Sequence, residues 1–198
     1  MKTVIYLILS LFCFCVSAED KPDGKELFQK HCSECHQKDG NSDDENIPKI
    51  AQFSAILIYD ILDQFKTGDR IAAKIKNKEG QLTDMATISK SLKTAEVEAI
   101  SYYISQQVSR PAKQAFDKEL AAKGKEIHLD LCENCHVDNG TNPIEDAPIQ
   151  KGQWKPYLIK QFEAFSKEER YIPRRMKKRF RKLSDEDKKA LIEFYISP

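Results

Sequence analysis

The chain has 198 residues, of which 32 are basic and 31 acidic, and its formal net charge is +1. This length predicts one or two domains. The balanced charge argues against a nucleic-acid-binding protein, for which a general positive excess is expected. No apolar stretch after residue 18 is long enough to span a bilayer.

The first 18 residues have the form of a secretory signal peptide. Lys2 supplies a positive start, residues 4–16 are almost continuously apolar, and Ser17 and Ala18 are small residues before the acidic Glu19. The apolar run is shorter than the roughly 20 residues that a spanning helix needs, which favours cleavage over a membrane anchor. We therefore expect cleavage after Ala18 and a periplasmic mature protein, residues 19–198, without a transmembrane segment.

The mature sequence predicts helices and little strand. In the first half, apolar residues recur at helical spacing over residues 24–31, 55–65 and 94–105. In the second half the corresponding segments are 124–131, 155–165 and 184–197, the last with an N-terminal capping signal at Ser184. A loop rich in Asp, Asn, Gly and Pro separates the first two helices of each half. The predicted fold class is all-α.

One pattern occurs twice, at an offset of 100 residues for most of its length. The shared positions are Gly24 and Gly124, Cys32 and Cys132, Cys35 and Cys135, His36 and His136, Gly40 and Gly140, Pro48 and Pro148, and Arg70 and Arg170. Gln52-Phe53 recurs as Gln153-Trp154 with one residue of shift, and the first copy has extra residues before Met85. Such a duplication predicts two tandem domains, residues 19–108 and 109–198, with a linker at about 106–116.

Each copy contains the motif CxxCH, and the two motifs use all four cysteines of the mature chain: Cys32, Cys35, Cys132 and Cys135. Zinc requires four ligands, and one motif supplies three. A redox-active CxxC needs no histidine directly after it, and a disulfide across three residues closes too small a loop to stabilise a fold. CxxCH is the attachment signature of c-type haem, in which two thiols bond to the porphyrin and the histidine reaches the iron. The sequence therefore predicts two covalently bound haem c groups.

His36 and His136 are the predicted proximal ligands of the two irons. His31 and His128 are expected on the same side as the motif, where packing near the haem is the simpler role. Signal removal leaves only Met85 and Met176, at matched positions before the last helix of each unit, on a loop that could cover the other haem face.

We predict Met85 and Met176 as the second axial ligands, with core packing as the alternative. Iron with both axial positions filled transfers electrons in preference to binding substrate. A carbonyl that accepts a hydrogen bond from the histidine ring is also expected. Pro48 and Pro148, each twelve residues after its histidine, are the candidates for it, with simple turn prolines as the alternative.

Charge is distributed unevenly between the two halves. Residues 19–108 contain 12 basic and 16 acidic side chains, whereas residues 109–198 contain 19 basic and 15 acidic. Seven basic residues lie within residues 174–182, RRMKKRFRK, around Met176. We interpret Arg174, Arg175, Lys177 and Lys178 as a candidate docking surface for an acidic redox partner, with a solvated charged face as the alternative.

The two CxxCH motifs and the segment HQKDGNS, residues 36–42, are similar to periplasmic dihaem cytochromes of the cytochrome c4 kind. The segments RPAKQAFDKELAAKGKEIHLDLCENCHVDNG (110–140) and GQWKPYL (152–158) more closely resemble the cytochrome subunit of flavocytochrome c sulfide dehydrogenase. PKIAQF (48–53) and MATISKSLKTAEVEAISYY (85–103) fit the same family, so the resemblance covers nearly all of the mature chain.

The resemblance implies two cytochrome c folds, each a few helices around one haem, in a heterodimer with a flavoprotein that oxidises sulfide at its own FAD. Electrons would pass through the two haems to a soluble acceptor cytochrome. This chain would not be an enzyme on its own, and it has no flavin-binding glycine motif. Two alternatives remain: a free dihaem carrier that donates to a terminal oxidase, and a haem enzyme such as a peroxidase or a thiosulfate-oxidising cytochrome. The matched methionines argue against the haem enzyme.

Overall fold

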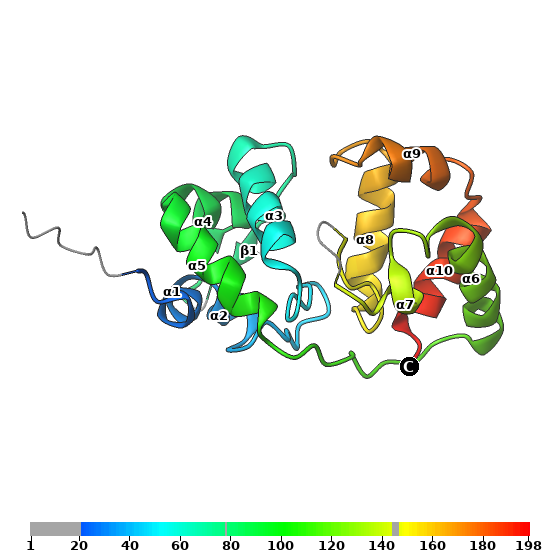
Figure 1. Cartoon of the computed structure of the whole chain (residues 1–198), viewed down its shortest axis with the longest axis horizontal. Coiled ribbons are helices and arrows are strands. Elements are labelled where there is room, and N and C mark those ends of the chain that lie inside the picture. The colour runs from blue at the N-terminus through cyan, green and yellow to red at the C-terminus, as the bar shows by residue number, and fades with distance from the viewer. Residues whose placement is uncertain (1–20, 78, 144–146) are drawn as a thin grey trace, which may run out of the picture.

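The computed structural model describes residues 21–77, 79–143 and 147–198, which form two helical units side by side (Figure 1). An extended segment joins the units along one edge of the molecule. The predicted signal peptide and its cleavage point after Ala18 lie outside the described residues. The predicted all-α fold class is confirmed, and the predicted domain bounds stay a prediction.

The first unit contains five helices and one short hairpin within its described residues. The helices are α1 (Gly24–His31), α2 (Ser33–His36), α3 (Ala55–Thr67), α4 (Met85–Ser91) and α5 (Thr94–Ser105). The hairpin pairs β1 (Ile75–Lys76) with β2 (Leu82–Thr83) in antiparallel register. It lies in the extra residues that the first copy carries before Met85. The sequence did not predict this hairpin.

The second unit contains five helices within its described residues and follows the same order. They are α6 (Lys118–Leu131), α7 (Val137–Gly140), α8 (Lys155–Ser166), α9 (Arg174–Phe180) and α10 (Asp185–Ile196). Short polar side chains set several helix starts. The Asp23 carboxylate accepts the backbone N–H of Lys25 at 2.8 Å, and Ser184 and Asp187 form the capping box that begins α10.

The first and last helices of each unit cross at very short range. A Cβ atom on Gly24 of α1 would lie 2.0 Å from the carbonyl oxygen of Ala99 in α5. A Cβ atom on Gly124 of α6 would lie 2.0 Å from the carbonyl oxygen of Ala190 in α10. Only glycine permits these crossings, because any side chain would overlap the backbone of the facing helix.

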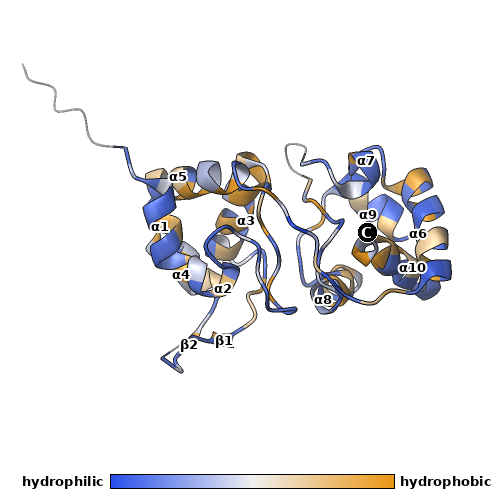
Figure 2. Cartoon of the chain, turned by 90° about the horizontal axis from the view of Figure 1, so that it is seen from below, coloured by the Kyte–Doolittle hydropathy of each residue, from blue (hydrophilic) through white to orange (hydrophobic). Residues whose placement is uncertain are grey.

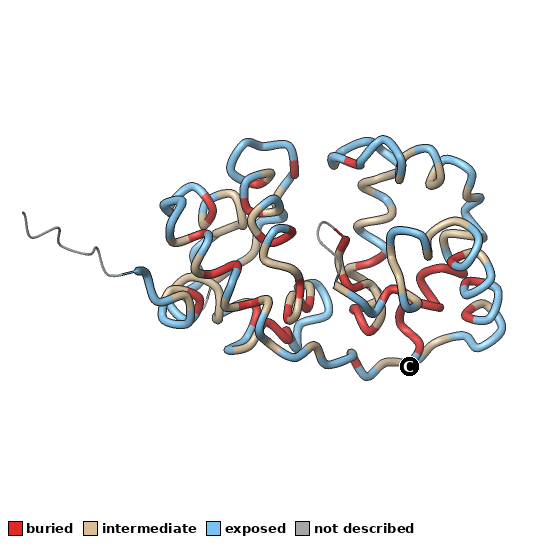
Figure 3. Tube along the Cα trace, in the orientation of Figure 1, coloured by how far each residue is buried: buried red, intermediate tan, exposed pale blue. Residues whose placement is uncertain are grey.

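Each unit has its own apolar core. The helices carry mixed polar and apolar residues (Figure 2), and the buried positions lie inside each unit and along α10 (Figure 3). In the first unit α1, α3 and α5 supply core residues, among them Phe28, Leu62 and Ile104. Ile149 of the second unit packs into this same cluster, so the first core extends across the boundary between the units.

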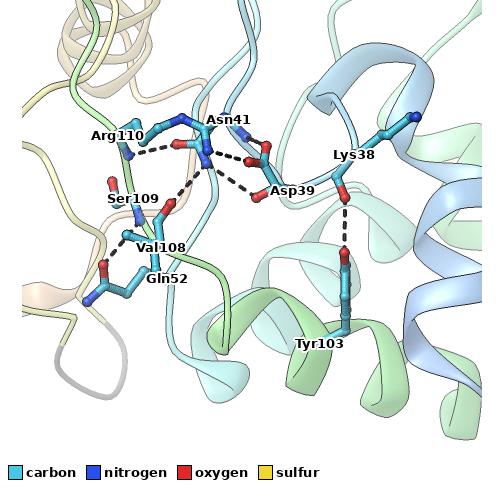
Figure 4. A network of polar contacts seen from close by, with 8 residues as sticks. All are labelled: Lys38, Asp39, Asn41, Gln52, Tyr103, Val108, Ser109 and Arg110. Carbon is cyan, nitrogen blue, oxygen red and sulfur yellow. Dashed lines mark hydrogen bonds and ion pairs between the residues drawn. The ribbon is translucent and has the colours of Figure 1, made fainter.

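The extended linker is hydrogen-bonded to both units. In Figure 4, the Asn41 side chain donates to the Val108 carbonyl at 3.0 Å and accepts from the Arg110 N–H at 2.8 Å. Arg110 also pairs with Asp39, and the Gln52 side chain accepts from the Ser109 N–H at 3.2 Å.

On the other side of the linker, the Ala112 N–H donates to the Gly152 carbonyl at 2.8 Å. The Gln114 side chain donates to the Gln153 carbonyl at 2.7 Å. The linker is thus held at several points and fixes one unit against the other.

The two units align without the shift that the sequence indicated at Gln52. Gln52 and Gly152 both have positive φ, 65° and 79°, and each donates its N–H to the C-terminal turn of the last helix, at Ile104 and Tyr195. Gln52 therefore corresponds to Gly152, and Phe53 corresponds to Gln153. The repeated glutamine misled the alignment, because the backbone conformation is the shared feature and not the side chain.

Candidate functional site

The first CxxCH motif follows directly from the end of a helix. Cys32 is the C-terminal cap of α1, and its N–H donates to the Phe28 carbonyl at 2.8 Å. The chain then turns again in α2, where the N–H groups of Cys35 and His36 both donate to the Cys32 carbonyl, at 3.2 and 3.0 Å. The two thiols and the imidazole are therefore presented from one tight turn, as attachment to a single flat group requires.

His36 is buried, and its ring orientation is fixed. Its Nδ1 lies 3.1 Å from the carbonyl oxygen of Pro48, the contact expected from the sequence. Burial lowers the pKa of His36 to about 4, so the ring is neutral at physiological pH. A neutral ring whose Nδ1–H donates to Pro48 keeps the lone pair on Nε2, which is the state that an iron ligand needs.

The second motif has the same backbone arrangement. Cys132 caps α6 and donates its N–H to the His128 carbonyl at 2.8 Å, and the His136 N–H donates to the Cys132 carbonyl at 2.9 Å. Burial raises the pKa of the Cys32 thiol to about 12 and also raises the pKa of Cys132. Both thiols are therefore neutral. The role of Pro148 towards His136 stays a prediction.

Both methionines lie in short helices and not on the loop that the sequence predicted. Met85 is the first residue of α4, which starts because the Asp84 carboxylate accepts the Thr87 N–H at 2.7 Å. Met85 packs against the first core. Met176 is the third residue of α9 and is partly buried. Their role as iron ligands stays a prediction.

A buried polar cluster beside the second motif was missed by the sequence analysis. His128 is fully buried, and its ring contacts the Tyr195 hydroxyl at 2.9 Å and the Glu133 carboxylate at 2.7 Å. Glu133 also accepts the N–H groups of Asp138 and Asn139, both in left-handed conformation, at 2.8 and 3.1 Å. His128 is therefore a structural residue. The sequence feature that could have indicated this cluster is Glu133, a charged residue between the two cysteines of the second motif.

Arg70 and Arg170 meet where the two units touch. They form an antiparallel backbone bridge, and their guanidinium groups lie over the rings of Phe65 and Phe165 at 4.8 and 4.7 Å. Gln161 accepts a hydrogen bond from each arginine. The sequence repeat paired these two arginines but did not predict their contact.

In the part of the chain that the structure describes, each of the two guanidinium groups has one buried nitrogen atom without a protein acceptor. Among the described residues, Arg70 Nη1 and Arg170 Nε have no hydrogen-bond partner, and neither arginine forms an ion pair with a carboxylate. Burial and the neighbouring Arg70 lower the pKa of Arg170 to about 10. Buried N–H groups of this kind require acceptors. A haem has two propionate carboxylates, which could accept hydrogen bonds from these N–H groups. The arginines, like the CxxCH motifs, therefore fit a haem cofactor.

The surfaces next to the two motifs differ in charge. A hollow beside Cys135 is lined by Asn134, Arg175, Lys178 and Arg179. The corresponding hollow beside Cys35 is lined by Glu34, Gln37, Asp44 and Ile47, with hairpin residues 75–77. Not all predicted docking charges are equivalent, because Lys177 pairs with Glu168 at 2.9 Å whereas Arg175 and Lys178 face the hollow.

Residues 22–107 match the protein-family model described as cytochrome c. The first unit is therefore similar to a cytochrome c domain. A cytochrome c domain carries haem covalently on its CxxCH motif, which supports haem c as the cofactor of the first unit. None of the helices in the described part of the chain is long and apolar enough to cross a membrane.

Most of the chain is similar to proteins named cytochrome c4. It is 27% identical over 143 residues to cytochrome c4 of Stutzerimonas stutzeri and 24% identical to that of Azotobacter vinelandii, covering 68% of this chain and 67% of each relative. The crystal structure of reduced cytochrome c4 from Pseudomonas stutzeri superposes with a TM-score of 0.71 at 27% identity, covering 90% of this chain and 98% of that one.

Two more distant structures share the fold. Cytochrome c4 of Acidithiobacillus ferrooxidans has a TM-score of 0.69 at 19% identity, with 85% of this chain and 99% of that one covered. Thiosulfate dehydrogenase of Marichromatium purpuratum has a TM-score of 0.70 at 20% identity, with 88% of this chain but only 39% of that one covered. The shared fold makes up nearly all of the two solved cytochrome c4 chains and only part of the thiosulfate dehydrogenase chain.

Proposed function

We propose that this chain is a periplasmic electron-transfer protein with one covalently attached haem c on each unit. The observation that carries the proposal is the repeated turn at Cys32–His36 and Cys132–His136, each placed at the end of the first helix of its unit. The first of these turns holds a buried histidine whose Nδ1–H is already engaged by Pro48. The second unit repeats the backbone of the first within a single packed chain.

Four residues of each unit would hold its haem. In the first unit Cys32 and Cys35 would form the thioether bonds to the haem, and His36 and Met85 would bind its iron. Cys132, Cys135, His136 and Met176 have the same roles in the second unit. The haem would supply one-electron transfer, and ligation by methionine would raise its reduction potential.

The contacts between the units make the pair of haems a relay. Held by the linker and by the arginine contacts, the two sites keep one relative position. Two haems held in this way would let an electron enter at one unit and leave from the other.

The donor that we propose is a flavoprotein subunit that oxidises sulfide at FAD, in a heterodimer with this chain. Its support is the resemblance at residues 110–140 and 152–158. In the structure, Gly152, Gln153 and Trp154 contact the linker and the first unit. That segment therefore fixes the two units together, and the flavoprotein proposal depends on the resemblance and not on an exposed binding surface.

A second candidate is a free dihaem carrier that donates to a terminal oxidase. The relatives named cytochrome c4 favour it, because one of them matches this chain over 98% of its solved structure.

The two candidates predict different complexes. The chain is purified gently from its native host, and haem and flavin are quantified in whatever co-elutes. One flavin per two haems, with haem reduction on addition of sulfide, establishes the subunit. Two haems and no flavin establish the free carrier. A protein without haem overturns the proposal as a whole.

The acceptor that we propose is a small soluble cytochrome with an acidic face, docking at Arg174, Arg175, Lys177 and Lys178. Charge complementarity of this kind mainly raises the association rate and is weakened by salt. The double variant Arg175→Gln/Lys178→Gln should slow electron exchange with an acidic partner at low ionic strength. The matched control, Lys118→Gln/Lys125→Gln, removes two exposed charges from α6. Equal rates for both double variants exclude this docking surface.

A further inference from the structure

One peptide group connects the second unit to the proximal histidine of the first. The carbonyl oxygen of Pro48 lies 3.1 Å from His36 Nδ1. The N–H of the same peptide group belongs to Lys49 and donates to Oε1 of Gln153 at 3.1 Å. The chain of hydrogen bonds therefore runs from the His36 ring through the Pro48–Lys49 peptide to a side chain more than 100 residues away.

The amide of Gln153 is held in one orientation. Its Nε2 donates to the Lys49 carbonyl while its Oε1 accepts from the Lys49 N–H, so a flipped amide would place donor against donor and acceptor against acceptor. Gln153 and Lys49 are only 3% and 6% exposed, so water does not replace these bonds. The backbone carbonyl of Gln153 is also fixed, because it accepts a hydrogen bond from the Gln114 side chain of the linker.

We propose that Gln153 is a positioning residue that tunes the first haem from the second unit. This proposal rests on the proposed function, since it requires a haem on His36. An amide N–H that donates makes the carbonyl of the same peptide group a better acceptor, because hydrogen bonds in a chain polarise one another. The bond from His36 to Pro48 is strengthened, the imidazole becomes a stronger electron donor, and the oxidised state of the first haem is favoured.

Among the described residues, the second unit receives no matching contact from the first. Phe53 occupies the place that corresponds to Gln153, and the N–H groups of Phe53 and Gln153 donate to Ile50 and Gln150 in the same way. The Phe53 side chain has no hydrogen-bonding group and is buried in the first core. The tuning is therefore one-sided and acts on the potential of the first haem.

The test compares the reduction potential of each haem in three variants. Gln153→Leu removes both amide bonds, whereas Gln153→Glu keeps an acceptor for the Lys49 N–H and loses only the donor. Trp154→Phe is the matched control, because it removes the 3.0 Å bond to the Ser42 carbonyl at the same interface without touching the peptide group beside His36. Potentials are measured by spectroelectrochemical titration. Each step is assigned by proton NMR, through the haem signals that contact His36 or His136.

In Gln153→Leu the reduction potential of the first haem should rise by about 30 mV. At a fixed applied potential its reduced-to-oxidised ratio then rises roughly threefold, since a tenfold change is about 59 mV for one electron. The second haem should not shift. In the reduced protein the ring N–H signal of His36 should move upfield, as a weaker hydrogen bond requires. Gln153→Glu should leave the first potential unchanged or lower it. If Gln153 had only a structural role, the reduction potential of the first haem would shift in the same direction in Gln153→Leu, Gln153→Glu and Trp154→Phe.

The proposal is overturned if the first haem of Gln153→Leu keeps its potential and its His36 signal, or if both haems shift equally in all three variants. If Gln153→Leu fails to fold, the near-isosteric Gln153→Glu decides alone: a raised first potential contradicts the proposal. Haem content is measured first, as the pyridine haemochrome, and it distinguishes failure of the proposed function from failure of the role proposed for Gln153. Wild-type protein without haem refutes the proposed function, whereas two haems with unmoved potentials refute only the role of Gln153.

Discussion

Replacing Gly124 by alanine should destabilise the second unit by separating α6 from α10. The added Cβ atom would lie 2.0 Å from the Ala190 carbonyl oxygen and 2.8 Å from the Cβ atom of Phe194. The first distance is about 1 Å shorter than the 3.0 Å limit below which Cβ contacts essentially never occur. Because the obstacle is backbone and not a flexible side chain, the two helices must move apart and disturb the core between them.

The magnitude follows from two opposing effects. Overpacking of a close helix contact costs about 1–3 kcal/mol, and a backbone obstacle places this case at the upper end. Alanine returns about 1 kcal/mol through its better helix propensity. A net loss of about 2 kcal/mol, with a denaturant slope of about 1 kcal/mol per molar urea for so small a unit, lowers the unfolding midpoint by about 2 M.

The assay is urea unfolding followed by fluorescence and by far-ultraviolet circular dichroism. Trp154 is the single tryptophan and lies in the second unit, so its fluorescence reports the unit that carries the substitution. Lys125→Ala is the control, since it changes the neighbouring, exposed position of the same helix. A Gly124→Ala midpoint within about 0.5 M of the wild type would refute the reasoning, because the close crossing would then carry no energetic weight.

Three further outcomes are expected. Replacing Cys132 and Cys135 together by serine should leave one covalent haem per chain, measured as pyridine haemochrome against protein; two retained haems would contradict the assignment. Asn41→Ala should cost about 1–3 kcal/mol through the two lost linker bonds and should speed tryptic cleavage after Lys113, an exposed linker residue; an unchanged cleavage rate would count against a clamped linker. Burial lowers the pKa of His128 below its usual value of about 6.5, so the unfolded chain binds the proton more readily and stability falls as pH drops below that value. His128→Phe should flatten this dependence of the urea midpoint between about pH 7 and pH 5, and an unaltered slope would exclude His128 as its source.

Local structure was largely predictable because local sequence carries it. The predicted helix at residues 24–31 has the bounds of α1, the one at 94–105 has those of α5, and Ser184 begins α10 as its capping signal indicated. Helical periodicity and caps act within a few residues, and so does the chemistry of CxxCH. The all-α fold and the haem chemistry of the two motifs follow from such short-range patterns.

The errors arose where several backbone conformations satisfy the same sequence. Residues 71–84 have no strong periodicity, and the hairpin there was missed. The sequence predicts loops at the two methionines, but both lie in short helices, which are capped at their N-termini by Asp84 and Pro173. The register at Gln52 followed side-chain identity, whereas positive φ at Gln52 and Gly152 defines the true correspondence.

The sequence by itself determined that two similar helical units each present two thiols and a histidine from one turn. Only the tertiary structure decided how the units act on each other. It placed Gln153 against the peptide beside Pro48, and it brought Arg70 and Arg170 together although neither has a carboxylate partner among the described residues. These partners lie about 100 residues apart, and no short-range pattern encodes a contact at that separation. The packing of two folded units creates such contacts, because it fixes which buried polar groups face one another across the boundary.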